Sequence, residues 1–71
     1  MNYEAIYELL ARYSPQTLPY FADAWSRMPQ GGHARFVLED LSRQRAFWAP
    51  RDSDLGAKFT AAIAAIETQN S

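Results

Sequence analysis

Prolines and a glycine pair divide this chain of 71 residues into four segments. The breaks fall at Ser14-Pro15, within the stretch 28–32 that holds Pro29 and the glycine pair, and at Pro50. Proline lacks a backbone donor and glycine permits positive φ, so helices commonly end at such positions. Within each segment the apolar residues recur at helical spacing, and no run alternates long enough to indicate a strand. The sequence therefore predicts an all-α fold, a small bundle of three to four short helices.

The ends of the predicted helices carry recognisable signals. The helices span about residues 2–13, 15–28, 33–48 and 54–68. Asn2 is a suitable N-cap for the first helix. Thr17 is the preferred cap of the second, because Pro19 then falls in the first turn, where proline is tolerated. Residues 51–54 supply a loop and a cap for the last helix. A single helical domain is expected over residues 1–68, followed by a frayed tail at 69–71.

Three of these helices show one apolar face each, which is typical of a helix packed on a core. The faces consist of Tyr3, Ile6, Leu9, Leu10 and Tyr13 in the first helix; of Leu18, Phe21, Ala22, Trp25 and Met28 in the second; and of Leu55, Phe59, Ala62, Ile63 and Ile66 in the fourth. We expect the first two helices to pair as a hairpin.

The third helix differs, because it has apolar residues on two sides. One arc is a normal core stripe formed by Ala34, Val37, Leu38, Leu41 and Trp48. The opposite arc contains Phe36, Asp40, Arg43 and Phe47. A helix of this kind is either central in its own domain or shared with another chain. Two interpretations follow: both phenylalanines belong to the core, or both contact a partner protein.

The size of the chain favours the second interpretation. Aromatic residues make up 14% of it, a large share for so small an interior. A domain this small rarely gains more than about 3–5 kcal/mol from its own core. Because cysteine is absent, disulfides cannot compensate. Binding to another protein or to a second copy is then the common route to stability, and a homodimer is expected.

Charge is unevenly distributed along the chain. Residues 27–51 carry five arginines against two acidic residues, whereas both flanking regions are acidic on balance. Arginine pairs with carboxylates through two parallel hydrogen bonds and stacks on aromatic rings, and it is enriched with aromatics at binding hot spots. The basic middle could equally meet the acidic ends of a second copy, or be an ordinary solvated surface. The predicted protein-binding residues are Phe36, Asp40, Arg43, Phe47, Trp48 and Arg51.

Residues that carry chemistry are few. His33 is the single histidine, there is no cysteine, and the carboxylates show no metal-ligand spacing. No nucleophile motif surrounds any serine, so we expect no enzymatic activity, cofactor or metal. The longest apolar run, residues 61–66, is much shorter than the ~20 residues of a membrane span. The first residues lack the features of a secretory signal, and a cytoplasmic location is expected.

The sequence therefore predicts a small non-enzymatic protein-binding regulator or inhibitor, which occupies a partner's surface with the aromatic and arginine face of its third helix. Two alternatives stay open. The second and third helices are joined by a glycine-containing turn, as in a DNA-binding helix-turn-helix, although the net charge of -1 argues against nucleic acid. A structural homodimeric assembly subunit is the other alternative.

Overall fold

The computed structural model describes residues 1–27 and 32–69, and every regular element in this part of the chain is helical. The elements are α1 (Tyr3–Tyr13), the 3₁₀ turn η1 (Pro15–Thr17), α2 (Leu18–Arg27), α3 (Gly32–Trp48) and α4 (Ser53–Gln69). The all-α prediction is thus confirmed. Residues 28–31 and 70–71, where we predicted a break, a core position at Met28 and most of a frayed tail, lie outside the described residues.

Local signals explain where the helices begin. The side chain of Asn2 accepts a hydrogen bond of 2.9 Å from the backbone N–H of Ala5, as predicted for an N-cap. In the same way, Oδ1 of Asp52 accepts a bond of 3.1 Å from the N–H of Leu55 in the first turn of α4. η1 uses Pro15 at its start, and α2 follows directly with Pro19 in its first turn. Both prolines therefore lie where a helix does not need their missing N–H.

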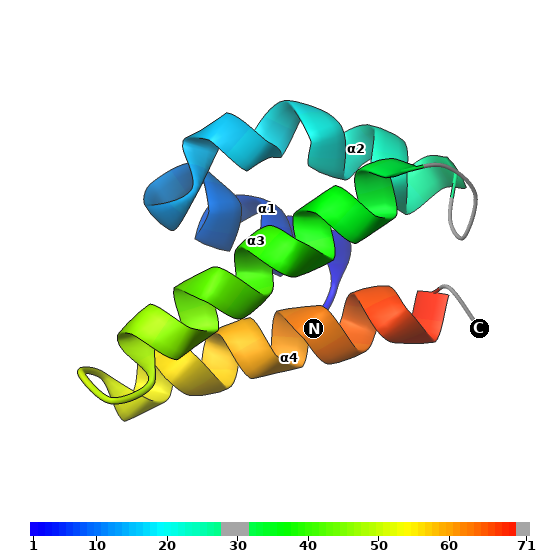
Figure 1. Ribbon diagram of the computed structural model, residues 1–71. Helices are drawn as coiled ribbons and strands as arrows, with labels where there is room; N and C mark the ends of the chain where they lie inside the picture. The colour runs from blue at the N-terminus through cyan, green and yellow to red at the C-terminus, as the bar shows by residue number, and fades with distance from the viewer. Residues whose placement is uncertain (28–31, 70–71) are drawn as a thin grey trace.

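The third helix is central, which is one of the two arrangements that its two apolar sides allowed. α3 runs through the middle of the molecule, with α4 alongside it on one side and α2 on the other, while α1 lies behind (Figure 1). α1 meets α2 through aromatic contacts, since the ring of Tyr3 stacks on Phe21 with 4.9 Å between centroids. Trp48 is the last residue of α3, so it belongs to the helix and not to the loop before Pro50.

The hydrophobic core draws on all four α-helices. Its buried apolar residues are Ile6, Leu9, Leu10, Phe21, Ala24, Ala34, Val37, Leu41, Leu55, Phe59, Ala62, Ile63 and Ile66. The faces predicted for the first and fourth helices are confirmed. The face predicted for the second is wrong in one position, because Ala22 is exposed and Ala24 is buried. α2 is rotated so that Phe21 and Ala24 point inward, on the same side as the buried Thr17 of η1.

The link between α3 and α4 depends on a close approach at Gly56. A Cβ placed on Gly56 would lie 2.7 Å from the Cα of Ala49, closer than real side chains come. Only glycine fits at this point of α4 without a backbone shift. The first turn of α4 can therefore pack directly on the start of the α3–α4 connection.

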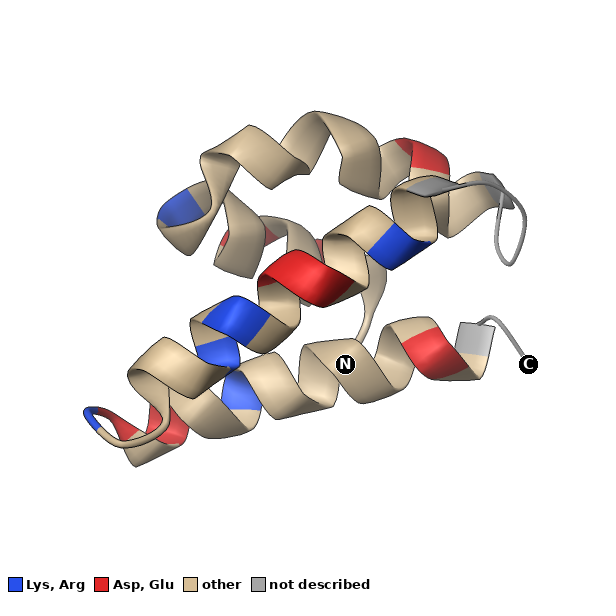
Figure 2. Cartoon of the chain, viewed as in Figure 1, with Lys and Arg blue, Asp and Glu red and all other residues tan. Residues whose placement is uncertain are grey.

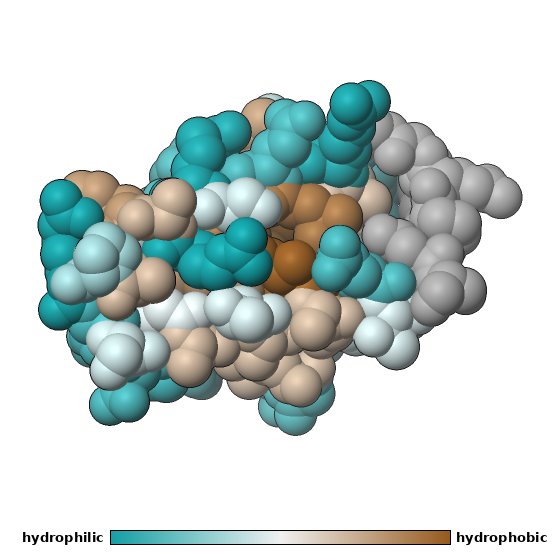
Figure 3. All heavy atoms as spheres, turned by 60° about the horizontal axis from the view of Figure 1, so that its bottom comes forward, coloured by the Kyte–Doolittle hydropathy of each residue, from teal (hydrophilic) through white to brown (hydrophobic). Residues whose placement is uncertain are grey.

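Some apolar surface remains on the outer side of α4. Ala57, Ala61 and Ala64 are all exposed there. Seen from the side of α4, strongly hydrophobic residues are visible near the centre of the face, with hydrophilic residues above and beside them and mildly hydrophobic residues below (Figure 3). No helix among the described residues has the length and apolar character that crossing a membrane requires.

Candidate protein-binding surface

The outer arc of α3 retains two exposed aromatic rings. Phe36 is 42% exposed and Phe47 is 49% exposed, although α2 and α4 both pack on this helix. The two residues are eleven positions apart in α3, which corresponds to a rise of about 16 Å on the same side of a helix. The fold therefore closes its core without fully enclosing either ring.

The middle of this arc is covered by η1. Asp40 is only 3% exposed, and its Oδ2 accepts hydrogen bonds from Oγ of Ser14 and, at 2.9 Å, from Oγ1 of Thr17. Both hydroxyl residues are completely buried. Nη2 of Arg43 donates to the other carboxylate oxygen at 3.2 Å. Three side chains thus donate hydrogen bonds to the Asp40 carboxylate, which would be costly to bury without partners.

Asp40 consequently differs from the role that we predicted. Its carboxylate binds groups of its own chain, so in this structure it offers no free oxygen face to a partner. The helical spacing placed Asp40 correctly between Phe36 and Phe47, but the spacing carried no information about Ser14 and Thr17, which lie 26 and 23 positions earlier. The predicted continuous face is therefore two exposed ends separated by a buried polar contact.

The first end, which we call the Phe36 cluster, consists of Phe36, Tyr20, His33 and Asp23. The Tyr20 ring meets the Phe36 ring edge-on, with 5.0 Å between centroids. It is tilted against the His33 ring, with 5.3 Å between centroids. Nδ1 of His33 lies 2.5 Å from Oδ2 of Asp23. Tyr20 is exposed and was not predicted as a site residue. Its position on the polar side of α2 was the signal that could have identified it.

The second end, which we call the Phe47 cluster, consists of Phe47, Trp48, Arg51 and Tyr13. The guanidinium of Arg51 lies over the Phe47 ring, 4.0 Å from its centroid, and also donates to the carbonyl of Phe47. The Trp48 ring is edge-on to Phe47 at 4.9 Å and to Tyr13 at 5.5 Å. The structure thus brings three predicted residues, Phe47, Trp48 and Arg51, into direct contact.

Positive charge accompanies the second end rather than the first. Lys and Arg residues are visible on the later half of α3, on α4 and in the loop that joins them (Figure 2). At the start of α3 the cationic groups face carboxylates instead: His33 faces Asp23, and Nε of Arg35 lies 3.5 Å from Oε1 of Glu39. This pairing leaves little unmatched positive charge where a recognition helix would contact phosphate.

Two residues of types that can act in catalysis already contact side chains of their own chain, one buried and one exposed. Ser14 is buried against Thr17 and Asp40, and His33 is engaged by Asp23. Among residues 1–27 and 32–69, no three or more histidine, cysteine, aspartate and glutamate side chains are grouped to hold a metal ion. What the surface offers is aromatic contact area with arginines beside it. No protein-family model matches the chain, and no curated protein or solved structure is similar enough to it to count as a match.

Proposed function

We propose that this protein is a small non-enzymatic regulator or inhibitor that acts by occupying the surface of a partner protein with the two exposed ends of α3. One observation carries the proposal: Phe36 and Phe47 stay 42% and 49% exposed in a domain whose core is already closed. Phe36 extends into a contact with the exposed Tyr20 and Phe47 into a contact with Trp48, and contiguous exposed apolar surface commonly marks interaction sites.

Arg51 of the Phe47 cluster and the nearby Arg43 support this function. Arg51 is held over the Phe47 ring, and Arg43 is held by Asp40. Both guanidinium groups are therefore oriented before binding, which reduces the entropy lost when a complex forms. Aromatic and arginine side chains dominate binding energy at measured interfaces. A partner needs to bury about 800 Å² on its own side to form a typical interface, and a rise of about 16 Å along α3 between Phe36 and Phe47 is compatible with such a patch.

A second copy of the chain is the other candidate partner, and the same two exposed rings favour it. In a homodimer each copy would cover the apolar area that the core of the other copy leaves exposed. The homodimer can be the regulator itself or a structural assembly subunit. We propose a cytoplasmic location for either form, because the sequence has no cysteine for disulfides and no helix within residues 1–27 and 32–69 could span a membrane.

The experiment that tests the proposal compares Phe36→Ala/Phe47→Ala with the natural chain. Each protein, immobilised, is exposed to host lysate, and a captured protein is identified by mass spectrometry, purified and titrated against both. We expect the double variant to keep its helical circular dichroism and to bind at least about 30-fold more weakly, because each lost hot-spot ring is worth ~1–2 kcal/mol.

Tyr7→Ala is the matched control, because Tyr7 is also an exposed aromatic residue but lies on α1. This control should bind with unchanged affinity. An equal loss of affinity in the control and the double variant would show that exposed aromatic residues bind the partner non-specifically, and it would contradict the proposal. Unfolding of the double variant would mean that the two rings hold the core together, and the surface would lose its assignment.

A further inference from the structure

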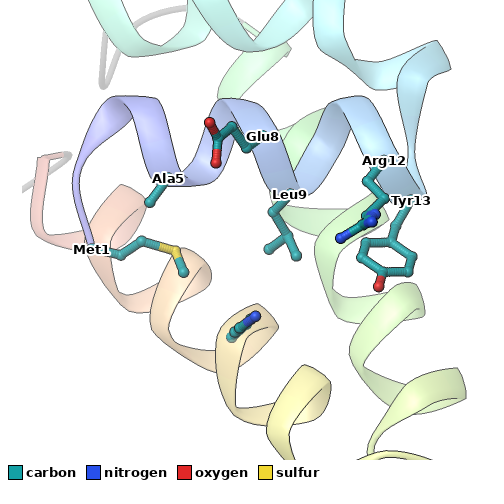
Figure 4. Close-up of a pocket in the computed structure, with 7 residues that line it drawn as sticks. Met1, Ala5, Glu8, Leu9, Arg12 and Tyr13 are labelled. Atoms are coloured by element: carbon teal, nitrogen blue, oxygen red, sulfur yellow. The ribbon is translucent and has the colours of Figure 1, made fainter.

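A hollow lies between α1 and α4, next to the surface used by the proposed function and sharing only Tyr13 with it. It has a volume of about 210 Å³ (Figure 4). Its apolar wall comes from Met1, Ala5 and Leu9, and Tyr13 closes one end. The side chain of Ala5 is small, and that of Leu9 is buried. Neither side chain fills the space between α1 and α4, and the hollow is the space that remains.

Two cationic side chains line this hollow, and the acidic side chain of Glu8 lines it as well. Arg12 of α1 and Lys58 of α4 both contribute to its lining and both are exposed. Glu8 is spaced to pair with Arg12 along α1, yet no ion pair joins either cation to a carboxylate within the described ranges 1–27 and 32–69. Figure 4 shows the Glu8 carboxylate pointing away from Arg12. The two positive charges are therefore available to an incoming anion.

Size and charge together indicate the kind of occupant. Sites for free small ligands usually enclose ~300–1,000 Å³, and this hollow is smaller. It has room for one large apolar group, with the rest of the occupant outside. We propose that the hollow binds one apolar side chain of an acidic segment of a partner protein, and that Arg12 and Lys58 hold the carboxylates next to that side chain. This inference rests on the proposal that the chain binds a protein, but apart from Tyr13 it uses different residues.

The hollow adjoins the Phe47 cluster through an aromatic side chain that belongs to both. The ring of Tyr13 closes the end of the hollow and also meets Trp48, which in turn meets Phe47. An acidic segment that leaves the hollow past Tyr13 therefore reaches the cluster where Arg51 lies. Carboxylates are the groups that arginine binds best through paired hydrogen bonds, so the same segment suits both places.

The test is an NMR titration of the full chain with the acetylated and amidated peptide Glu-Glu-Leu-Glu-Glu. We expect the backbone signals of Ala5, Leu9 and Lys58 to shift on binding. The variant Arg12→Gln/Lys58→Gln should raise Kd at least about tenfold, because two charge-assisted contacts are lost. The control variant Arg35→Gln/Arg45→Gln removes the same amount of charge from α3, away from the hollow, and it should change Kd less than about twofold.

Two further peptides test the chemistry. Replacing the glutamates by glutamine, or the leucine by alanine, should each weaken binding at least about tenfold. Equal binding of the glutamine peptide, or no signal shift at millimolar peptide, would overturn the proposal. Free hexanoate binding as tightly as the peptide would also overturn it, because the site would then be one for small carboxylic acids.

The same titration separates this inference from the proposed function. Phe36→Ala/Phe47→Ala should bind the peptide with unchanged affinity, since both rings lie outside the hollow. If the peptide fails to bind while the two rings still prove necessary for capture of the partner, the hollow is unused and the proposed function stands. If the peptide binds at the hollow while the rings prove dispensable, the proposed function is wrong in its residues.

Discussion

Asp40 shows how one polar residue can fix the position of a neighbouring element. Its carboxylate is buried in α3 and accepts hydrogen bonds from Ser14 and Thr17, which precede and close η1. This contact attaches η1 to α3. It also sets the rotation of α2, because α2 continues directly from Thr17. The burial of Ala24 in place of Ala22 follows from that rotation.

Asp40→Ala should lower the free energy of unfolding by about 2–4 kcal/mol, measured by urea denaturation at neutral pH. The reason is that two buried hydroxyls lose their acceptor while a cavity forms. Glu39→Ala is the matched control, because Glu39 is the adjacent acidic residue and its side chain is 61% exposed. We expect that control to stay within about 0.5 kcal/mol of the natural chain. Equal stability of both variants would show that the carboxylate cluster does not fix η1.

Single residues also limit what could be predicted of the candidate site. Phe47, Trp48 and Arg51 were predicted and do come together, because they are close in sequence and two of them lie at the end of one helix. Tyr20 joins the site from α2 and was missed, since its contact with Phe36 spans two helices. Arg12 and Lys58 were missed for the same reason, since they come from α1 and α4 and only the packing of these helices places both in the lining of one hollow.

Among the helices, α3 and α4 depend most on a close approach of their backbones. Gly56 lies inside α4, where alanine would normally be the better helix former by about 1 kcal/mol. Its neighbour Ala49 comes so close that any Cβ at position 56 requires a shift of backbone atoms. Steric fit and helix propensity therefore favour opposite residues at this position.

Gly56→Ala should reduce the free energy of unfolding by about 1–3 kcal/mol, because overpacking outweighs the gain in propensity. Chemical denaturation followed by circular dichroism measures this change. Ala61→Gly, at an exposed position of the same helix, calibrates propensity alone and should lower stability by about 1 kcal/mol. A higher stability of Gly56→Ala would show that the contact with Ala49 yields without strain.

At the scale of the whole molecule, the exposed rings and the small core together predict self-association. We expect the Tm to rise with protein concentration, since a second copy that binds only the folded state stabilises it by mass action. Light scattering should give a mass near twice the 8.1 kDa of one chain at several hundred micromolar. Phe36→Ala/Phe47→Ala should remain at the mass of one chain. A constant Tm and a single-chain mass at all concentrations would exclude the homodimer.

The sequence by itself determined the four helices, their approximate ends and the inward faces of α1 and α4. These properties depend on residues within one or two turns of each other, such as the Asn2 cap and the apolar spacing of Phe59 and Ile63. The central place of α3 was one of the two arrangements that its sequence allowed, and the exposed Phe36 and Phe47 show that its second apolar side is not fully covered.

Only the tertiary structure decided that Asp40 is buried, that α2 turns Ala24 inward, and that a hollow with two cations separates α1 from α4. Each of these features requires side chains from two elements to meet at a particular rotation and distance. Helical periodicity gives the direction of a side chain around its own axis. It gives no information about which distant hydroxyl, ring or charge lies opposite, and that placement depends on how all the helices pack at once.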